Sequence, residues 1–278
     1  MKKLLILLIA AAMLLAGCKQ ETADSPATAD TAATEKVKTK KLNEPVVPTE
    51  APTEAPKPTE PSFEELVQKK YESILSGKSE KKQVAMNEVY ALNQLDGMEA
   101  GCEALALTAA LTHFGYKLDM DEIVDKYLVY SDDYVFGYCG DPHYFGDGSG
   151  IFPPGMVTTI QNFVKDKKAA IYPFDTTGMS LDDLYKFVEK GCPVLIWTSV
   201  ERQEPYFDGG TEYNGIFYPW FPTEHCVCLY GYDKSDGQVL VADSWYGTDE
   251  WEDASWFTEL YNEIGKFSMI LMDTSDLR

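Results

Sequence analysis

The chain contains little histidine and little positive charge. Only three of its 278 residues are histidine, and 24 Lys and Arg residues stand against 45 Asp and Glu residues, which gives a formal net charge of −21. Nucleic-acid binding depends on Lys and Arg contacts to phosphates, so this balance argues against a nucleic-acid partner. It argues equally against electrostatic adhesion to anionic lipid or cell-wall polymer, whereas long-range attraction to cationic peptides stays open.

The uncharged apolar run near the start of the chain is too short for a membrane-spanning helix. Lys2 and Lys3 precede apolar residues 4–15, a pattern of secretory-signal length, so residues 1–17 are predicted to be a signal peptide. Residues 15–18 read Leu-Ala-Gly-Cys and resemble a bacterial lipobox. This resemblance implies lipidation of Cys18, which would anchor the protein on the extracytoplasmic face of a bacterial cell membrane. The alternative is a plain secretory signal followed by a coincidental cysteine.

The segment that follows lacks both aromatic residues and glycine. Residues 19–62 consist mainly of Thr, Ala, Glu, Lys and Pro, with a short Pro-Thr-Glu-Ala repeat at 48–56. Such a composition cannot bury enough apolar surface to offset the entropy of ordering, so residues 18–62 are predicted to be a disordered tether. A well-extended tether of this kind would hold the next domain on the order of 100 Å from the bilayer.

The remaining residues suit one globular domain of α+β class. Ser62 and Glu65 form a capping box that predicts a short helix within residues 63–83. The main domain is predicted over residues 84–278, where helices precede antiparallel strands. After an extended start at 84–92, the periodicity predicts helices at 102–114, 118–128, 155–164, 181–190 and 254–264, and strands at 169–172, 193–200, 225–232, 238–243 and 267–272.

Four residues within this domain form a candidate catalytic set. Cys102 is predicted to begin a helix, where the unpaired amides and the helix dipole favour a reactive thiolate. His225, at the start of a strand, is the candidate base, and Asp243, at the end of the next strand, is placed to orient its ring. Gln94 is the candidate side-chain donor to an oxyanion, together with the backbone amide of Cys102.

The segments around these residues resemble a known family. They read NQLDGMEAGCEALA at 93–106, EHCVCLYGYD at 224–233 and VADSWYG at 241–247, and they resemble the double-glycine leader-peptidase-like family of papain-fold cysteine peptidases, in its stand-alone branch. The resemblance covers roughly residues 84–272. It implies a papain-like fold with an N-terminal helical part and a late antiparallel sheet, and hydrolysis of peptide bonds through an acyl-enzyme on Cys102.

Two alternative functions stay open. The same residues would serve a peptidoglycan stem-peptide hydrolase or transpeptidase, although enzymes of that kind usually complete the triad with a second histidine rather than an aspartate such as Asp243. The third interpretation is a non-catalytic lipoprotein that binds a peptide or a protein. The family resemblance includes exporter domains that cut after Gly-Gly, whereas this chain carries an export signal and lacks a transporter, so that preference does not transfer. The expected partner is a peptide or protein substrate.

Other candidate residues fit the chemistry less well. His113 lies three turns along the Cys102 helix and cannot meet its sulfur, and His143 lies in a Gly-rich loop at the expected rim of the site. Cys139 is a rival nucleophile without a helix start. Residues 201–223 are expected to overhang the site and, with two further aromatic residues, to form a substrate wall; these are Trp197 and Trp245.

No cofactor or metal is expected. The run from His225 through Cys226 to Cys228 has the residue types of a metal site, but neighbouring residues on a strand point to opposite faces. The two cysteines should therefore face the core together, away from His225. Export permits disulfides, but spacing assigns no pairs among the cysteines not given a role, which are Cys139, Cys192, Cys226 and Cys228.

Overall fold

The computed structural model describes residues 60–148 and 150–277. The predicted signal peptide, Cys18 and the predicted tether as far as residue 59 lie outside these described residues. Within the described ranges, no helix is both long enough and apolar enough to cross a membrane.

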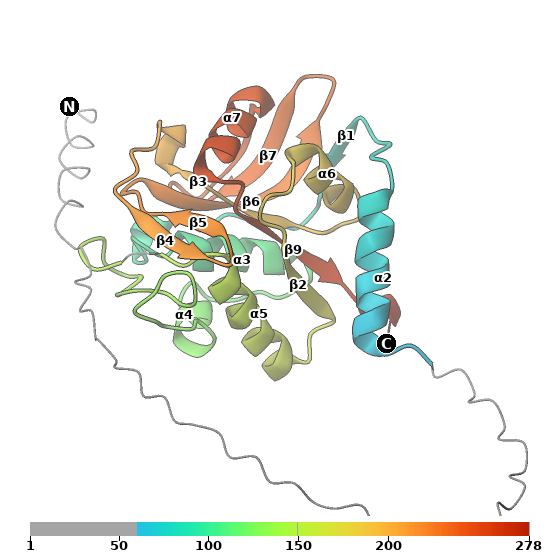
Figure 1. The fold of residues 1–278 in the computed structure, drawn as a ribbon, viewed down its shortest axis with the longest axis horizontal. Helices are drawn as coiled ribbons and strands as arrows, with labels where there is room; N and C mark the ends of the chain where they lie inside the picture. The colour runs from blue at the N-terminus through green and yellow to red at the C-terminus, as the bar shows by residue number, and fades with distance from the viewer. Residues whose placement is uncertain (1–59, 149, 278) are drawn as a thin grey trace, which may run out of the picture. The chain divides into compact units, whose positions relative to one another are not determined.

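Most of the helices lie in the first half of the described chain and most of the strands in the second (Figure 1). The α-helices are α2 (Phe63–Ser76), α3 (Cys102–His113), α4 (Glu122–Lys126), α5 (Pro153–Lys167), α6 (Leu181–Glu189) and α7 (Ala254–Ile264). Short 3-10 turns occur at η2 (Gln94–Asp96), η3 (Val200–Arg202) and η4 (Ser275–Leu277).

One large antiparallel sheet forms the centre of the molecule. Its strands are β1 (Gln83–Ala85), β2 (Ile171–Asp175), β3 (Val194–Ser199), β6 (Glu224–Asp233), β7 (Gln238–Asp243), β8 (Thr248–Asp253) and β9 (Ser268–Asp273). They lie in the order β2-β9-β3-β6-β7-β8, and β1 pairs with the last part of β6. A separate hairpin joins β4 (Gly210–Tyr213) to β5 (Ile216–Pro219). The central position of β6 brings the residues at its start next to both β3 and β7.

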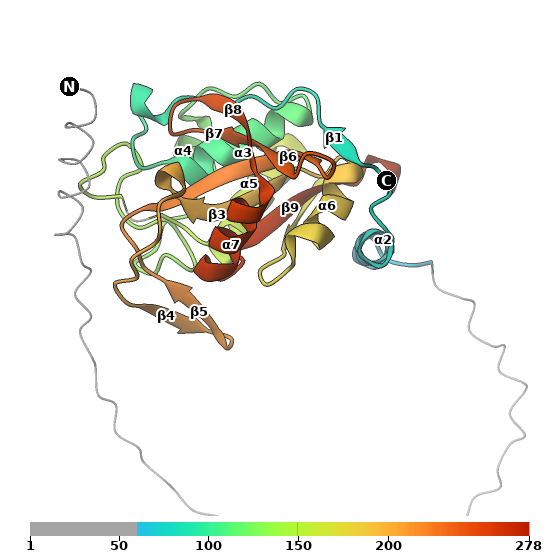
Figure 2. The same cartoon turned by 90° about the horizontal axis from the view of Figure 1, so that it is seen from above.

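Helices cover both faces of the sheet. Figure 1 and Figure 2 show α3, α4 and α5 on one face and α6 and α7 on the other. The contacts agree with this view, because α3 packs on β6, β3 and β7, whereas α7 packs on β3, β7 and β8. This layered arrangement is an α+β fold, as the sequence predicts.

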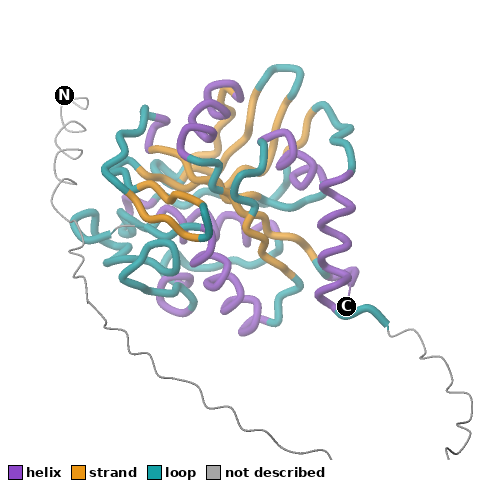
Figure 3. Tube along the Cα trace, in the orientation of Figure 1, coloured by secondary structure: helices purple, strands orange, loops and turns teal. Residues whose placement is uncertain are grey.

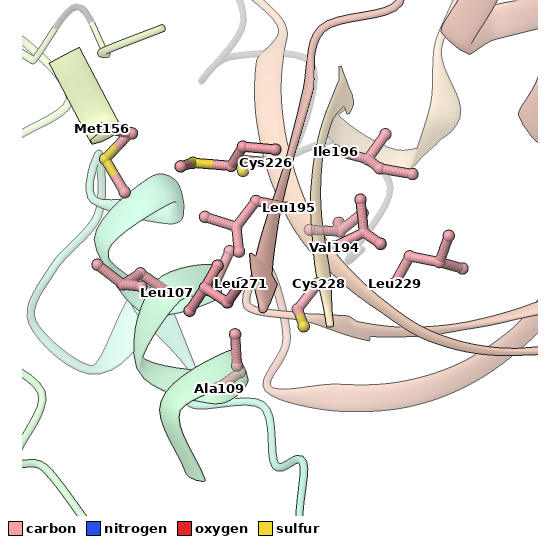
Figure 4. Close-up of a cluster of buried hydrophobic side chains, with 14 of the residues drawn as sticks. Leu107, Ala109, Met156, Val194, Leu195, Ile196, Cys226, Cys228, Leu229 and Leu271 are labelled. Carbon is pink, nitrogen blue, oxygen red and sulfur yellow. The ribbon is translucent and has the colours of Figure 1, made fainter. Parts of the chain in front are cut away.

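The buried core follows the alternation of side chains along the strands. Figure 4 shows Cys226, Cys228 and Leu195 on the side of the sheet that faces α3, whereas Ile196 and Leu229 point to the opposite side. All five are completely buried. The prediction that Cys226 and Cys228 face the core together is therefore confirmed.

Helix α2 packs on the body of the domain through apolar side chains, among them the buried Val67 and the partly buried Tyr71. Its capping box forms as predicted, with Ser62 accepting a hydrogen bond from the Glu65 amide. Tyr71 stacks on Phe174 of β2, with ring centroids 4.4 Å apart, and also contacts Phe187 of α6. The helix thus extends the same apolar core.

Several predicted elements differ from the observed ones. The extended segment at 84–92 is a strand only as far as Ala85, because Glu88 adopts a left-handed φ of 60° that ends sheet geometry. The helix predicted over 118–128 is confined to α4, which ends where Tyr127 turns its ring against Phe163 of α5. Strand β8 and the β4–β5 hairpin were not predicted; β8 reads Thr-Asp-Glu-Trp-Glu-Asp, and acidic residues are depleted in strands.

Two long loops meet at one side of the sheet (Figure 3). One joins α4 to α5, and the other joins β3 to β6 and contains the β4–β5 hairpin. They contact each other where the Tyr134 hydroxyl donates to the Tyr218 carbonyl oxygen over 3.1 Å, and where the Phe136 ring meets the Tyr213 ring edge-on. This is the side on which α3 and β6 begin.

Candidate active site

Cys102 is the first residue of α3, as the sequence predicts. The preceding residue, Gly101, lies against Met98, and a Cβ atom at position 101 would come within 2.3 Å of the Met98 Cγ atom. Met98 is completely buried and cannot move aside easily. Close packing therefore accounts for glycine immediately before Cys102, whose own side chain is 5% exposed.

His225 and Asp243 lie side by side on adjacent strands. β6 and β7 pair antiparallel, so the start of β6 meets the end of β7. The Nε2 atom of His225 lies 2.6 Å from the Oδ1 atom of Asp243, and the imidazole ring is completely buried. The Trp245 amide donates to the same Oδ1 atom over 2.8 Å. A ring that donates from Nε2 keeps its lone pair on Nδ1, the nitrogen that is then able to accept a proton.

The other oxygen of Asp243 is held by Arg202, which the sequence analysis missed. The Arg202 Nη2 atom lies 3.1 Å from the Asp243 Oδ2 atom, and the Arg202 Nε atom donates to Glu252 over 2.8 Å. Burial by itself would raise the pKa of the Asp243 carboxyl, but His225 and then Arg202 hold this pKa well below its usual range. Asp243 is consequently ionised. Nothing in the local sequence around Arg202 signals this contact, because the partners are 41 positions apart.

Gln94 is fixed by hydrogen bonds at both ends of its amide group. Its Oε1 atom accepts from the Ser244 hydroxyl over 2.7 Å, and its Nε2 atom donates to the Glu99 carbonyl oxygen over 2.9 Å. The backbone amide of Gln94 donates to the Ser244 carbonyl oxygen over 2.8 Å. Since an amide nitrogen has two protons, one N–H of the Gln94 side chain is left for another acceptor.

The Cys102 thiol lies among acidic groups. Its Sγ atom donates to the Glu103 Oε2 atom over 3.3 Å. Burial raises the pKa of Cys102 well above its usual value, and the carboxylates of Glu103 and Glu224 raise it further. The amide of Cys226, the residue after His225, acts on the sulfur in the opposite direction. The pKa of Cys102 is therefore raised and not lowered as the helix start predicts, because the thiol is buried and lies beside acidic groups.

The predicted contact between the thiol and the imidazole is not formed in this arrangement. Within residues 60–148 and 150–277, the Nδ1 atom of His225 is buried and has no hydrogen-bond partner, and Cys102 donates to Glu103 instead. The sequence analysis missed both Glu103 and Glu224. The available signal was their position, since each is adjacent in sequence to a predicted catalytic residue.

A cleft joins the predicted residues Gln94 and Cys102. The segment from β3 to β6 lines part of it, as predicted, and the α4–α5 loop contributes an aromatic ring and three glycines that the sequence analysis did not assign. The cleft is lined by Gln94, Glu99, Ala100, Cys102, Phe145, Gly146, Gly148, Gly150, Val200, Trp220, Phe221, Pro222, Glu224 and Trp245.

Of the two tryptophans expected in the substrate wall, only one is there. Trp245 lines the cleft. Trp197 is wrongly placed by the sequence analysis, because it is completely buried and donates from Nε1 to the Ile151 carbonyl oxygen over 3.0 Å. Its position in the middle of β3, on a face covered by helix, explains its burial.

Among the described residues, the competing candidates are not part of the cleft lining and have other partners. His143 bridges Asp141 and Asp121 at 2.9 and 3.1 Å. His113 bonds to the Asn87 carbonyl oxygen over 3.0 Å, and the Cys139 thiol donates to the Ser131 carbonyl oxygen over 3.0 Å. Cys192, Cys226 and Cys228 are buried free thiols.

One group of side chains near the cleft has the composition of a cation site. The Cys102 sulfur and one carboxylate oxygen from each of Glu103 and Glu224 all lie within 4.8 Å of one another. Thiolate and carboxylate are both ligand types of divalent cations.

The chain is similar to known proteins in sequence and in fold. Over 198 residues the chain is 25% identical to the uncharacterized protein YvpB of Bacillus subtilis (strain 168), with 66% of this chain and 74% of YvpB covered. The fold is similar to that of a candidate C39-like peptidase from Bacillus anthracis, with a TM-score of 0.57, 24% identity and coverage of 69% of this chain and 98% of the other. A more distant likeness, with a TM-score of 0.40, 14% identity and coverage of 72% and 88%, is to xylellain, a cysteine protease from Xylella fastidiosa.

A family match covers most of the described domain. Residues 86–269 match the Peptidase_C39 like family, a stretch that includes Gln94, Cys102, His225 and Asp243. The match extends over well more than half of the chain and agrees with the resemblance seen in the sequence. The chain belongs to the Peptidase_C39 like family.

Proposed function

We propose that this protein is a cysteine peptidase that hydrolyses peptide bonds through an acyl-enzyme on Cys102. The observation that carries the proposal is the 2.6 Å hydrogen bond between His225 and Asp243, next to a cleft that Cys102 and Gln94 line. Membership of the Peptidase_C39 like family supports the same reaction class. A buried base with a fixed tautomer, a thiol at a helix start and an amide donor are the parts that acyl transfer to sulfur needs.

In the proposed reaction His225 moves one proton in each half. Its Nδ1 atom takes the thiol proton as the Cys102 sulfur attacks the carbonyl carbon, and Asp243 stabilises the imidazolium formed. The free N–H of the Gln94 side chain and the Cys102 amide donate to the oxyanion. His225 then protonates the leaving amine, which leaves a thioester on Cys102. Water, deprotonated by His225, cleaves the thioester and restores the thiol.

The reactive arrangement requires a small movement of the nucleophile. The Cys102 sulfur bonds to Glu103 at present, and it must leave that carboxylate for the Nδ1 atom of His225. Rotation about a single side-chain bond accomplishes such a change, and catalytic hydrogen bonds are often formed only in the presence of substrate. Because the resting thiol is protonated, the proton and the sulfur move together.

The experiment is a digest of a peptide library with the full-length protein, read by mass spectrometry. Cys102→Ala is expected to abolish cleavage. His225→Ala is expected to lower kcat/KM on the order of 10²–10⁴-fold, the contribution of general acid–base catalysis. Gln94→Ala is expected to lower it about 10²–10³-fold, as loss of an oxyanion donor does. Cleavage that persists in Cys102→Ala would overturn the proposal.

Two control variants separate the proposed site from the other thiols and imidazoles. Cys139→Ala removes a second buried thiol, and His143→Ala removes an imidazole paired with carboxylates. Both are expected to keep wild-type cleavage. If Cys139→Ala loses more activity than Cys102→Ala, the nucleophile is Cys139 and the assignment to Cys102 is wrong.

One observation favours a second, non-catalytic function. A buried thiol that is bonded to Glu103 and has a raised pKa is a poor nucleophile at rest, so the cleft would suit a peptide that is bound and not cut. Alkylation at neutral pH decides between the two. In an enzyme the Cys102 thiol reacts with iodoacetamide at neutral pH and the His225→Ala variant loses this reactivity, whereas in a binding protein the buried thiol reacts slowly at neutral pH with or without His225.

We propose that the enzyme works at the outer surface of a bacterial cell membrane, attached through lipid on Cys18. The proposal rests on the signal-like residues 1–17 and the lipobox-like residues 15–18. An acidic domain on a long tether is suited to substrates that are peptides or proteins outside the cytoplasm, and its charge favours cationic ones.

A further inference from the structure

Two carboxylates, one buried and one partly buried, accompany the Cys102 thiol, and the proposed reaction uses neither of them. Glu103 follows Cys102 in α3, and Glu224 precedes His225 in β6. One ligand atom from each of Cys102, Glu103 and Glu224 lies within 4.8 Å of the other two. Three groups that ionise to negative charge therefore lie close together at the cleft.

The described residues provide no ion pair for either glutamate. Glu103 accepts from the Ile151 amide over 2.7 Å through Oε1 and from the Cys102 thiol through Oε2. The Oε1 atom of Glu224 is buried and has no hydrogen-bond partner within residues 60–148 and 150–277. A buried acceptor without a partner is costly, so a further group is needed at this atom.

Both carboxylates lie close to the backbone at Gly150. A Cβ atom at Gly150 would lie 2.7 Å from the Glu103 Oε1 atom and 2.9 Å from the Glu224 Oε2 atom. Glycine at this position, with a φ of +80°, therefore allows both carboxylates to approach the same stretch of backbone. Gly150, Glu224 and Cys102 all line the cleft, so these groups adjoin the space through which a solute would enter.

We propose that Cys102, Glu103 and Glu224 bind a thiophilic divalent cation of the Zn²⁺ class. The sulfur and two carboxylate oxygens supply three ligands, and water in the cleft supplies the fourth position of a tetrahedral site. Binding releases the thiol proton to solvent and leaves a thiolate on the metal, so the added charge offsets the buried negative charge. The thiolate excludes Ca²⁺ and Mg²⁺, which take oxygen ligands.

The bound cation would keep Cys102 from reacting. A thiolate that ligates the metal cannot attack a carbonyl, so the metal-loaded protein is a resting form and removal of the metal frees the nucleophile. The site itself does not depend on the proposed peptidase activity, because it would bind metal equally in a protein that only binds peptides.

The experiment titrates the full-length protein, freed of metal by a chelator, with Co²⁺ and then Zn²⁺. Co²⁺ bound to a thiolate gives a sulfur-to-metal charge-transfer absorption in the near ultraviolet, so it reports the sulfur directly. One equivalent of Co²⁺ is expected to produce this band. Zn²⁺ is expected to displace the bound Co²⁺ and so remove the band. Ca²⁺ and Mg²⁺ are expected to leave it unchanged. No band, or a band insensitive to Zn²⁺, would overturn the proposal.

Substitutions locate the site. Cys102→Ser is expected to remove the band, and Glu224→Gln, which keeps the shape of the side chain, is expected to weaken Co²⁺ binding at least about tenfold. Glu99→Gln is the matched control, because Glu99 lines the same cleft outside the ligand set and should bind Co²⁺ as the wild type does. A band that survives Cys102→Ser in a folded protein contradicts the proposal, as does equal affinity in Glu224→Gln and wild type.

A second cluster on the surface is tested in the same titration. His143, Asp141 and Asp121 offer an imidazole and two carboxylates, but no thiol. His143→Ala is expected to keep the charge-transfer band. If the protein binds Zn²⁺ only when His143 is present, the metal site lies there and the assignment to Cys102 is wrong.

Discussion

At the scale of single residues, two ionisable groups of the candidate site lie in opposite electrostatic surroundings. Asp243 lies between His225 and Arg202, which hold its pKa below the usual range, whereas the Cys102 thiol lies among carboxylates that raise its pKa. The base side of the site is therefore preorganised, and the nucleophile side is held in its protonated form. For the reaction to begin, the Cys102 thiol has to meet the His225 ring, either when substrate binds or through a change of side-chain rotamer.

Arg202 is expected to be required for stability as well as for the position of Asp243. Its side chain is 9% exposed and pairs with both Asp243 and Glu252. Arg202→Leu leaves two partly buried carboxylates without a counterion, so the free energy of unfolding should fall by about 3–5 kcal/mol. Urea denaturation measures the change. Lys70→Met is the control, since the partner of Lys70, Asp276, is 61% exposed and the loss should stay below about 1 kcal/mol.

His143 is expected to make stability depend on pH. Hydrogen bonds to Asp141 and then to Asp121 raise the pKa of the His143 ring above 6.5. The hydrogen bonds that the His143 amide and ring donate to Asp141 lower the pKa of that carboxyl below 3.8. The contribution of His143 to the free energy of unfolding is complete below pH 6.5, and it is lost as the pH rises through the raised pKa of the folded protein. The aspartate contribution is lost as the pH falls through the lowered pKa.

The measurement is urea denaturation of wild type and His143→Gln from about pH 5 to about pH 9, a range that spans the titration of histidine. The wild type is expected to exceed the variant in stability most at the acidic end, with a smaller difference at the alkaline end. A difference that grows toward alkaline pH would contradict the assigned direction.

At the scale of elements, local sequence signals are reliable where a cap or a regular period is present. Helix α7 spans Ala254–Ile264 as predicted, and Asp253 caps it by accepting from the Trp256 amide. Strand β7 also has its predicted bounds, because a continuous run of apolar residues between two polar ones marks it. Strand β8 was missed because its exposed acidic side chains are stabilised by pairing with β7, a contact that leaves no local pattern.

The capping box of α2 is expected to contribute measurably to stability. Ser62→Ala removes the acceptor of the Glu65 amide, and loss of such a cap costs about 1 kcal/mol. Ser76→Ala, at the other end of the same helix, removes a hydroxyl that donates over 3.3 Å to a carbonyl oxygen within the helix and should cost less than about 0.5 kcal/mol. Urea denaturation of both variants compares them. Equal losses would mean that the cap is not formed in solution.

At the scale of the whole molecule, Cys18 is expected to decide where the protein resides. In a bacterial host, wild-type protein should sediment with membranes and partition into detergent. Cys18→Ser removes the thiol that carries the lipid, so the protein should move to the soluble exported fraction or keep an uncleaved signal. Fractionation with immunoblotting measures this. Membrane association that is unchanged in a Cys18→Ser protein whose signal has been cleaved would contradict lipid anchoring at this residue.

The sequence by itself determined the α+β class, the helix that begins at Cys102 and the pairing of His225 with Asp243. Each depends on local features, namely a helix start and two strands joined by a short turn, which bring the ends of β6 and β7 together without further information. Only the tertiary structure decided which charges surround them. Arg202 reaches Asp243, and Glu224 reaches Cys102, because sheet order and helix packing bring distant segments together, and no local pattern encodes that packing.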